Sequence, residues 1–215
     1  MNEDSIQTQY DLTKKTKIKK IYEEYKNLIY SALLILIITV ISINFYLSSK
    51  EKKKILLTDN YISAKIYLAN GKNNEAKNIL KQIVYDDDST YSTLSLFLIL
   101  DEDLITDNEE MSNLFDHVLK NNKFEKEVEN SIIYKKLLFQ ANFVSEQELL
   151  ESIKPLINKD SIWKPHALLL AGDYFFFKEE YLKAKEFYIQ ILDLKNIQNE
   201  LYKQARSQLA FIPND

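Results

Sequence analysis

The residue types that could carry chemistry in this chain are few and scattered. His117 and His166 are the only histidines, and neither has the H-x-x-x-H spacing or the neighbouring carboxylates that would complete a zinc site. The chain has no cysteine, which excludes thiolate catalysis, sulfur-ligated metals and disulfides. The acidic run Asp86–Asp88 has the composition of a cation site, but acids just before Ser89 more often favour the positive end of the next helix. We therefore predict structural or surface roles for these residues and no metal.

Composition also excludes the glycine-dependent catalytic motifs. Gly71 and Gly172 are the only glycines, so no G-x-S-x-G turn, phosphate-binding loop or dinucleotide fingerprint is possible. A net charge of −4 argues against binding to the nucleic-acid backbone. We predict a protein that is not an enzyme and holds no cofactor. A metal-dependent hydrolase that uses the two histidines is the enzymatic alternative, which we do not favour.

The clearest element is an uncharged stretch of twenty residues, Leu28–Leu47. As a helix it is about 30 Å long, which matches the hydrocarbon core of a bilayer. A cleaved signal peptide has a shorter apolar core and small residues after it, and a soluble core helix has a polar stripe. We expect a transmembrane helix over 28–48, a lysine-rich tail with a juxtamembrane helix over 1–27, and one domain over 49–215.

The remaining residues favour an all-α domain. Two glycines and three prolines are too few for a turn-rich β fold. Apolar periodicity and cap signals, among them T-x-x-E at Thr106 and S-x-x-E at Ser145, predict about nine antiparallel helices. Their expected bounds are 50–68, 74–84, 91–100, 107–120, 124–143, 146–158, 163–177, 181–192 and 201–209.

Two of these helical hairpins share one spacing. A small residue is followed by an aromatic residue three positions on, by Ala twelve on, and by a large apolar residue sixteen on. This spacing is typical of the tetratricopeptide repeat (TPR), in which small residues let two helices approach closely. The positions are Ala64, Tyr67, Gly71, Ala76 and Leu80 in the first hairpin, and Gly172, Phe175, Glu179, Ala184 and Tyr188 in the second. We expect a TPR-like α-solenoid with degenerate repeats between them.

From about residue 15 to residue 212 the chain resembles the YfgM-type tetratricopeptide proteins. The resemblance rests on the lysine-rich tail, the single span, the A-K-x-Y-L-x-x-G-x-x-x-x-A hairpin from Ala64, and the segments 162–167 and 206–210. It implies a bacterial inner-membrane protein with a cytoplasmic N-terminus and a periplasmic repeat domain. It also implies an accessory role beside the SecYEG translocon, in which exported polypeptides pass to periplasmic chaperones. No catalytic residue is implied.

The aromatic residues, 14 Tyr and 11 Phe, suit packing between helices, and a minority could line a peptide-binding groove. Trp163 is the first candidate for either role, and packing between hairpins is the favoured one. A cell-envelope scaffold, for instance in division or wall synthesis, is the alternative function. Six lysines before the span and four just after it favour a cytoplasmic N-terminus only slightly.

Overall fold

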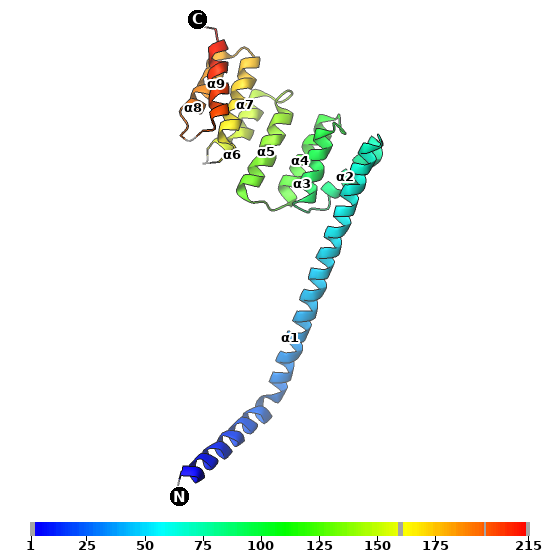
Figure 1. Ribbon diagram of the computed structural model, residues 1–215, viewed down its shortest axis with the longest axis vertical. Helices are drawn as coiled ribbons and strands as arrows, with labels where there is room; N and C mark the ends of the chain where they lie inside the picture. Colours follow the sequence, from blue (N-terminus) through cyan, green and yellow to red (C-terminus); the bar gives the residue numbers. More distant parts are fainter. Residues whose placement is uncertain (1–2, 159–160, 196, 214–215) are drawn as a thin grey trace. The chain divides into compact units, whose positions relative to one another are not determined.

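The computed structural model describes residues 3–158, 161–195 and 197–213, and side chains from residue 19 on except at 20, 21 and 29. These ranges contain nine α-helices and no strand, which confirms the all-α class (Figure 1). The helices are α1 (Glu3–Ala69), α2 (Asn73–Val84), α3 (Tyr91–Asp101), α4 (Asn108–Asn121), α5 (Lys126–Gln140), α6 (Glu146–Ile157), α7 (Lys164–Phe177), α8 (Tyr181–Leu192) and α9 (Asn199–Phe211).

Helix α1 joins the juxtamembrane helix, the apolar stretch and the segment predicted as a helix over 50–68 into one continuous element. The helix predicted over 50–68 has no start of its own, because α1 continues through the apolar stretch to Ala69. No glycine or proline interrupts it before Asn70-Gly71. The apolar stretch is long enough to cross a membrane, and none of the hydrophobic side chains that the structure describes in it is buried against the protein.

The chain divides into two compact units, residues 1–56 and residues 57–215. We call the second of these the helical unit. In the second unit each helix from α2 onward packs against the next one along the chain. Contacts also join alternate helices, namely α2 with α4, α5 with α7, and α7 with α9. The path of the chain can be followed from cyan to red in Figure 1.

Buried side chains of the second unit form two core clusters. We call the first the amino-terminal core cluster; it contains Ala64, Leu80, Val84, Leu96, Ile99, Leu104, Ile105, Met111, Leu114, Phe115, Val118 and Ile132. We call the second the carboxy-terminal core cluster; it contains Leu137, Leu149, Ile153, Leu156, Ala167, Leu168, Leu169, Ala171, Tyr174, Phe175, Ala184, Tyr188, Ile191, Leu201 and Ala205. Helix α5 contributes to both clusters, through Ile132 and Leu137.

Three turns in this unit have the same backbone geometry. One follows α3, where Asp103 has a φ of 49° and the N–H of Leu104 donates to the Ile99 carbonyl at 3.0 Å; the other two lie in the hairpins that share the TPR spacing. Gly71 and Glu179 hold the equivalent position and both adopt left-handed backbone, with φ of 71° and 62°. In each turn the next residue donates its N–H to a carbonyl five residues earlier, from Lys72 to Tyr67 and from Glu180 to Phe175, both at 2.9 Å. The left-handed conformation that suits the glycine thus recurs at a glutamate.

The predicted helix starts are correct at one cap and displaced at another. Ser145 and Glu148 form the predicted capping box, each satisfying a backbone N–H of the other. The box predicted from Thr106 to Glu109 is wrong by one residue, because the Asp107 side chain accepts from the N–H of Glu110 at 2.8 Å. An aspartate is at least as good an N-cap as a threonine, so the helix starts at the residue after it. Helix α5 is shorter than predicted at both ends.

Candidate functional site

The two histidines lie in separate surroundings. His117 on α4 pairs through Nε2 with an Asp87 carboxylate oxygen at 2.8 Å, and its ring packs edge-on against Tyr85. The Asn121 amide lies 3.0 Å from His117 Nδ1. His166 lies in the first turn of α7, where its ring contacts Tyr134 and Trp163. Among the described residues, no group of three or more His, Cys, Asp or Glu side chains could hold a metal ion.

The second predicted repeat hairpin brings its small and large residues together. Gly172 on α7 faces Tyr188 on α8 so closely that a Cβ atom on Gly172 would lie 2.5 Å from Cε1 of the tyrosine. Phe175, Ala184 and Tyr188 are fully buried. The absence of a side chain at Gly172 is therefore what allows the Tyr188 ring to lie between the two helices.

The Tyr188 hydroxyl also makes a hydrogen bond in this hairpin, and its pKa is raised. It donates to Asp173 Oδ1 at 2.7 Å. Burial, followed by the bond to Asp173, raises the pKa of the Tyr188 phenol. Burial also raises the pKa of Asp173, against the opposing effect of the Tyr188 hydrogen bond. The pair is thus a partly buried polar contact within a helix hairpin, and the sequence pattern did not indicate it.

The first predicted repeat hairpin shows the same burial at three positions. Ala64, Ala76 and Leu80 are fully buried, while Tyr67 is half-buried and its ring lies under the Lys72 ammonium. Gly71 is exposed and a Cβ there would meet nothing within 4 Å, so its backbone conformation is the reason for glycine.

Trp163 joins two hairpins. Its indole N–H donates to the backbone carbonyl of Glu127 at the start of α5, at 3.1 Å. Its ring packs on Tyr134 of α5, with centroids 5.3 Å apart. Ser161 reinforces the joint, since its hydroxyl donates to the Glu127 carboxylate and accepts from Asn130. Trp163 therefore packs between α5 and α7.

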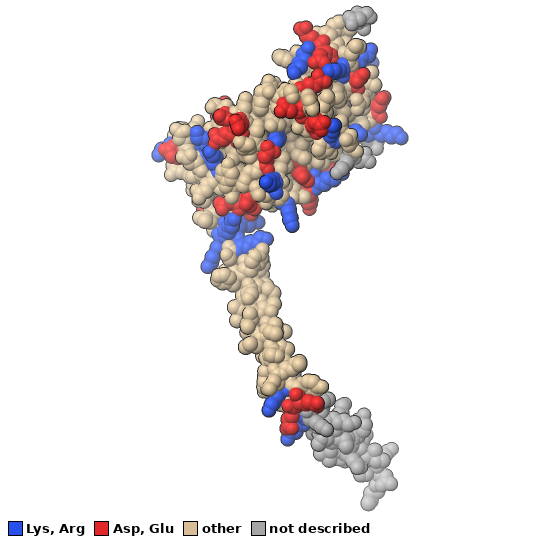
Figure 2. Space-filling view, turned by 180° about the vertical axis from the view of Figure 1, so that it is seen from behind, with Lys and Arg blue, Asp and Glu red and all other residues tan. Residues whose placement is uncertain are grey.

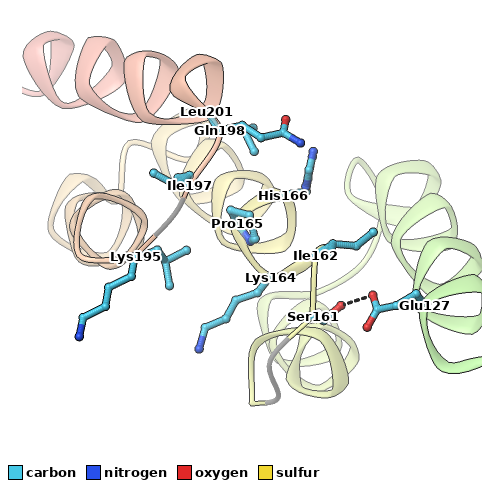
Figure 3. Close-up of a pocket in the computed structure, with 11 residues that line it drawn as sticks. Glu127, Ser161, Ile162, Lys164, Pro165, His166, Lys195, Ile197, Gln198 and Leu201 are labelled. Carbon is cyan, nitrogen blue, oxygen red and sulfur yellow. Dashed lines mark hydrogen bonds between the residues drawn. The ribbon is translucent and has the colours of Figure 1, made fainter.

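A groove of about 460 Å³ lies beside this joint (Figure 3). Three segments build it: the start of α5, the residues that lead into α7, and the connection from α8 into α9. Its apolar wall comes from Ile162, Pro165, Leu194, Ile197 and Leu201. Ile162 stands out, because 68% of it is exposed although it is a large apolar side chain. Ligand sites commonly combine such an apolar wall with a few polar groups.

The polar groups of the groove have different charges on different sides. The lysines Lys164 and Lys195 extend in the same direction at one side, and the Glu127 carboxylate points toward Ser161 at another (Figure 3). His166 and Gln198 lie near each other at the remaining edge. Nδ1 of His166 is buried and, within the described part of the chain, has no hydrogen-bond partner. The groove therefore offers apolar contact together with groups that can bind a carboxylate or a backbone amide.

Sequence reasoning missed the groove. It singled out Trp163, which does not line it, and passed over Lys195, Ile197 and Gln198, which do. These residues come from a connection between helices and carry no motif. One signal was available in the sequence. Apolar residues occur near helix ends, where exposed polar residues are the usual expectation. They are Ile162, Pro165, Leu194 and Ile197.

Comparison with known proteins returns no match to a protein-family model, to a curated protein or to a solved structure.

Proposed function

We propose that this protein is a non-catalytic interaction module, anchored in a bacterial inner membrane, whose TPR-like α-solenoid binds polypeptide segments. In this proposal the N-terminus lies in the cytoplasm and the helical unit on the periplasmic side. The module acts as an accessory to the SecYEG translocon and passes exported polypeptides to periplasmic chaperones. The observation that carries the binding role is the groove with its apolar wall and paired lysines.

Two findings support the solenoid. One turn geometry, with a left-handed residue followed by the same hydrogen bond, recurs after α1, α3 and α7, and two of these turns lie in the hairpins that share the TPR spacing. Contacts between sequential and alternate helices are the pattern of a chain that stacks one hairpin on the next. Such stacking produces extended surfaces suited to peptides.

Because the protein is anchored in the membrane, its groove can bind clients there with low affinity and little sequence specificity. The exposed apolar stretch of α1 supplies the anchor, and only nine residues separate Leu47 from Leu57, the first buried residue of the helical unit. A short tether raises the effective concentration of the groove near clients at the membrane. An exported chain, still extended, can place an apolar side chain against Ile162 and a carboxylate beside Lys164 or Lys195.

Site-specific photocrosslinking in intact cells tests the binding role. A photoreactive phenylalanine analogue at Ile162 should capture translocon subunits or chains in transit, and the double change Lys164→Glu with Lys195→Glu should weaken the capture several-fold. Leu182 is the matched control, because it is 77% exposed and lies outside the groove. Equal capture from Leu182 and Ile162, or capture at Ile162 of unrelated proteins alone, would contradict the proposal.

Protease protection tests the direction of the anchor. Protease added to intact spheroplasts should digest the helical unit, whereas a helical unit on the cytoplasmic side stays intact until the cells are lysed. A unit protected in sealed spheroplasts would remove the periplasmic partners from the proposal.

A further inference from the structure

The residues that follow the apolar stretch carry a concentrated positive charge. Lys50, Lys52, Lys53 and Lys54 lie within five positions, with Glu51 as the one acid among them, for a net charge of +3. All five side chains are exposed. We call residues 50–54 the lysine collar; Figure 2 shows a band of basic side chains at this end of the uncharged stretch. The collar belongs to α1, whose backbone is helical throughout.

The lysines of the collar are spread around the helix. An α-helix advances about 100° per residue, so Lys50, Lys53 and Lys54 share one side while Lys52 lies about 160° from Lys54. A partner protein contacts one face of a helix, whereas lipid headgroups surround a helix that crosses the bilayer. The angular spread therefore fits a headgroup layer better than it fits a single protein surface.

The depth of the collar fits the same layer. Lys50 lies three residues beyond Leu47 and Lys54 seven, which is about 4.5 to 10.5 Å along the helix axis. The polar layer on each side of a bilayer core is roughly 5 to 8 Å thick. Lysine stems are long enough to reach back into this layer while their ammonium groups stay hydrated.

We propose that the lysine collar binds the phosphates of anionic lipid headgroups and so enriches these lipids around the anchor. This inference rests on the membrane anchor of the proposed function and extends it, because the anchor then selects lipids as well as holding the protein. Each lysine near an anionic surface strengthens the association roughly five-fold, so four of them yield a marked preference.

The test uses the full chain in vesicles of phosphatidylcholine with one quarter phosphatidylglycerol. Spin-labelled phosphatidylglycerol and phosphatidylcholine report the fraction of each lipid immobilised on the protein. We expect several-fold preference for the anionic lipid, falling toward unity with added salt and when the four collar lysines are changed to Gln. Four Lys→Arg changes at the same positions should keep the preference, since they keep the charge.

A matched variant changes four exposed lysines of the helical unit, Lys120, Lys123, Lys185 and Lys203, to Gln and should keep the preference. The proposal would be overturned if the preference for the anionic lipid were unchanged by the Lys→Gln changes in the collar. It would also be overturned if the matched variant lost the preference to the same extent. Alkaline carbonate extraction separates this from failure of the anchor: a chain that leaves the vesicles has no span, and both proposals then fail. A chain that resists extraction but shows no lipid preference contradicts the collar alone.

Discussion

At the scale of single residues, the close approach of α7 and α8 at Tyr188 depends on Gly172. The nearest ring atoms of Tyr188 would lie 2.5 and 2.7 Å from a Cβ at this position, well inside van der Waals contact. Tyr188 is fully buried and cannot swing away without disturbing its neighbours. The glycine is therefore required for space, in contrast to Gly71, which is required for backbone conformation.

Gly172→Ala should destabilise the protein. Overpacking costs about 1 to 3 kcal/mol, and the better helix propensity of alanine returns about 1 kcal/mol, so we expect a net loss of up to about 2 kcal/mol. Urea unfolding of the full chain in detergent, followed by fluorescence of the single tryptophan, measures it. The loss should shrink in a Tyr188→Leu background, which removes the ring; an unchanged loss would contradict the packing explanation.

The Asp173–Tyr188 pair makes stability depend on pH. Because burial raises the pKa of Asp173 above its ordinary value of 3.8, the folded state holds the proton more tightly than the unfolded state. The stability contributed by this group is thus fully present below about pH 3.8 and is lost as the pH rises through the folded pKa. At neutral pH the carboxylate is charged and partly buried, which opposes folding.

Asp173→Asn should raise the melting temperature at pH 7 and have little effect near pH 3.5. Asparagine still accepts the Tyr188 hydroxyl through its amide oxygen but bears no charge. Glu148→Gln is a control of opposite sign, because the backbone N–H and hydroxyl of Ser145 lower the pKa of Glu148 and its contribution is present above pH 4.5. A lower melting temperature for Asp173→Asn than for the wild type at pH 7 would contradict this explanation.

At the scale of elements, the turns between helices hold three non-glycine residues in left-handed backbone, namely Asp87, Asp103 and Glu179. Aspartate tolerates this region better than glutamate does, so the strain is clearest at Glu179. Glu179 has a φ of 62°, in the left-handed region that costs a non-glycine residue about 1 to 2 kcal/mol. Gly71 holds the equivalent turn at little cost. The hydrogen bonds that close the turn are the same in both hairpins, so the turn persists even where its residue is unfavourable.

Glu179→Gly should stabilise the protein by roughly 0.5 to 1 kcal/mol, because relief of the strain exceeds the extra entropy that glycine loses on folding. Chemical unfolding measures the gain. The neighbouring Glu180→Gly is the control, since Glu180 has a φ of −86° and its replacement should destabilise. A gain from both substitutions, or from neither, would show that the left-handed backbone is not the cause.

Helix α4 begins at the cap that the structure assigns to Asp107. Asp107→Ala should cost about 1 kcal/mol, since it leaves the N–H of Glu110 without its side-chain acceptor. Thr106→Ala, at the position favoured by the sequence pattern, should be nearly neutral. Thermal melts of the two variants decide between the assignments, and the reverse order of effects would restore Thr106 as the cap.

At the scale of the whole molecule, the two core clusters of the helical unit meet at α5. Ile132 and Leu137 belong to different clusters although they lie on one helix. Most contacts join a helix to its immediate or next neighbour. In such a chain, the free energy of unfolding is close to a sum of contributions from neighbouring helices. A destabilising substitution therefore affects the helices around it first.

Leu80→Ala should therefore increase local unfolding around the amino-terminal core cluster more than around the carboxy-terminal one. Leu80 is fully buried in the amino-terminal core cluster, and its truncation should cost about 2 to 5 kcal/mol. Hydrogen exchange of the full chain should accelerate in α2, α3 and α4 and stay unchanged in α8 and α9. Uniform acceleration across all these helices would show that the unit unfolds as one cooperative body.

Local properties were the ones that could be predicted without the structure. The helical class follows from composition, the helix ranges from apolar periodicity, and the Ser145 box from the affinity of one side chain for its own backbone. The error at α4 has a local cause as well. Asp107 out-competes Thr106 for the same cap, so α4 begins one residue later than predicted.

The sequence by itself determined that this protein is helical, that it carries an apolar stretch long enough to cross a bilayer, and that lysines follow that stretch. These properties depend on neighbours along the chain. Only the tertiary structure decided that Glu127, Ser161 and Lys195 line one groove, that Trp163 packs in the adjacent joint, and that Asp173 is half-buried beside Tyr188. These contacts depend on how helices cross and where their connections run, which no spacing in the sequence specifies.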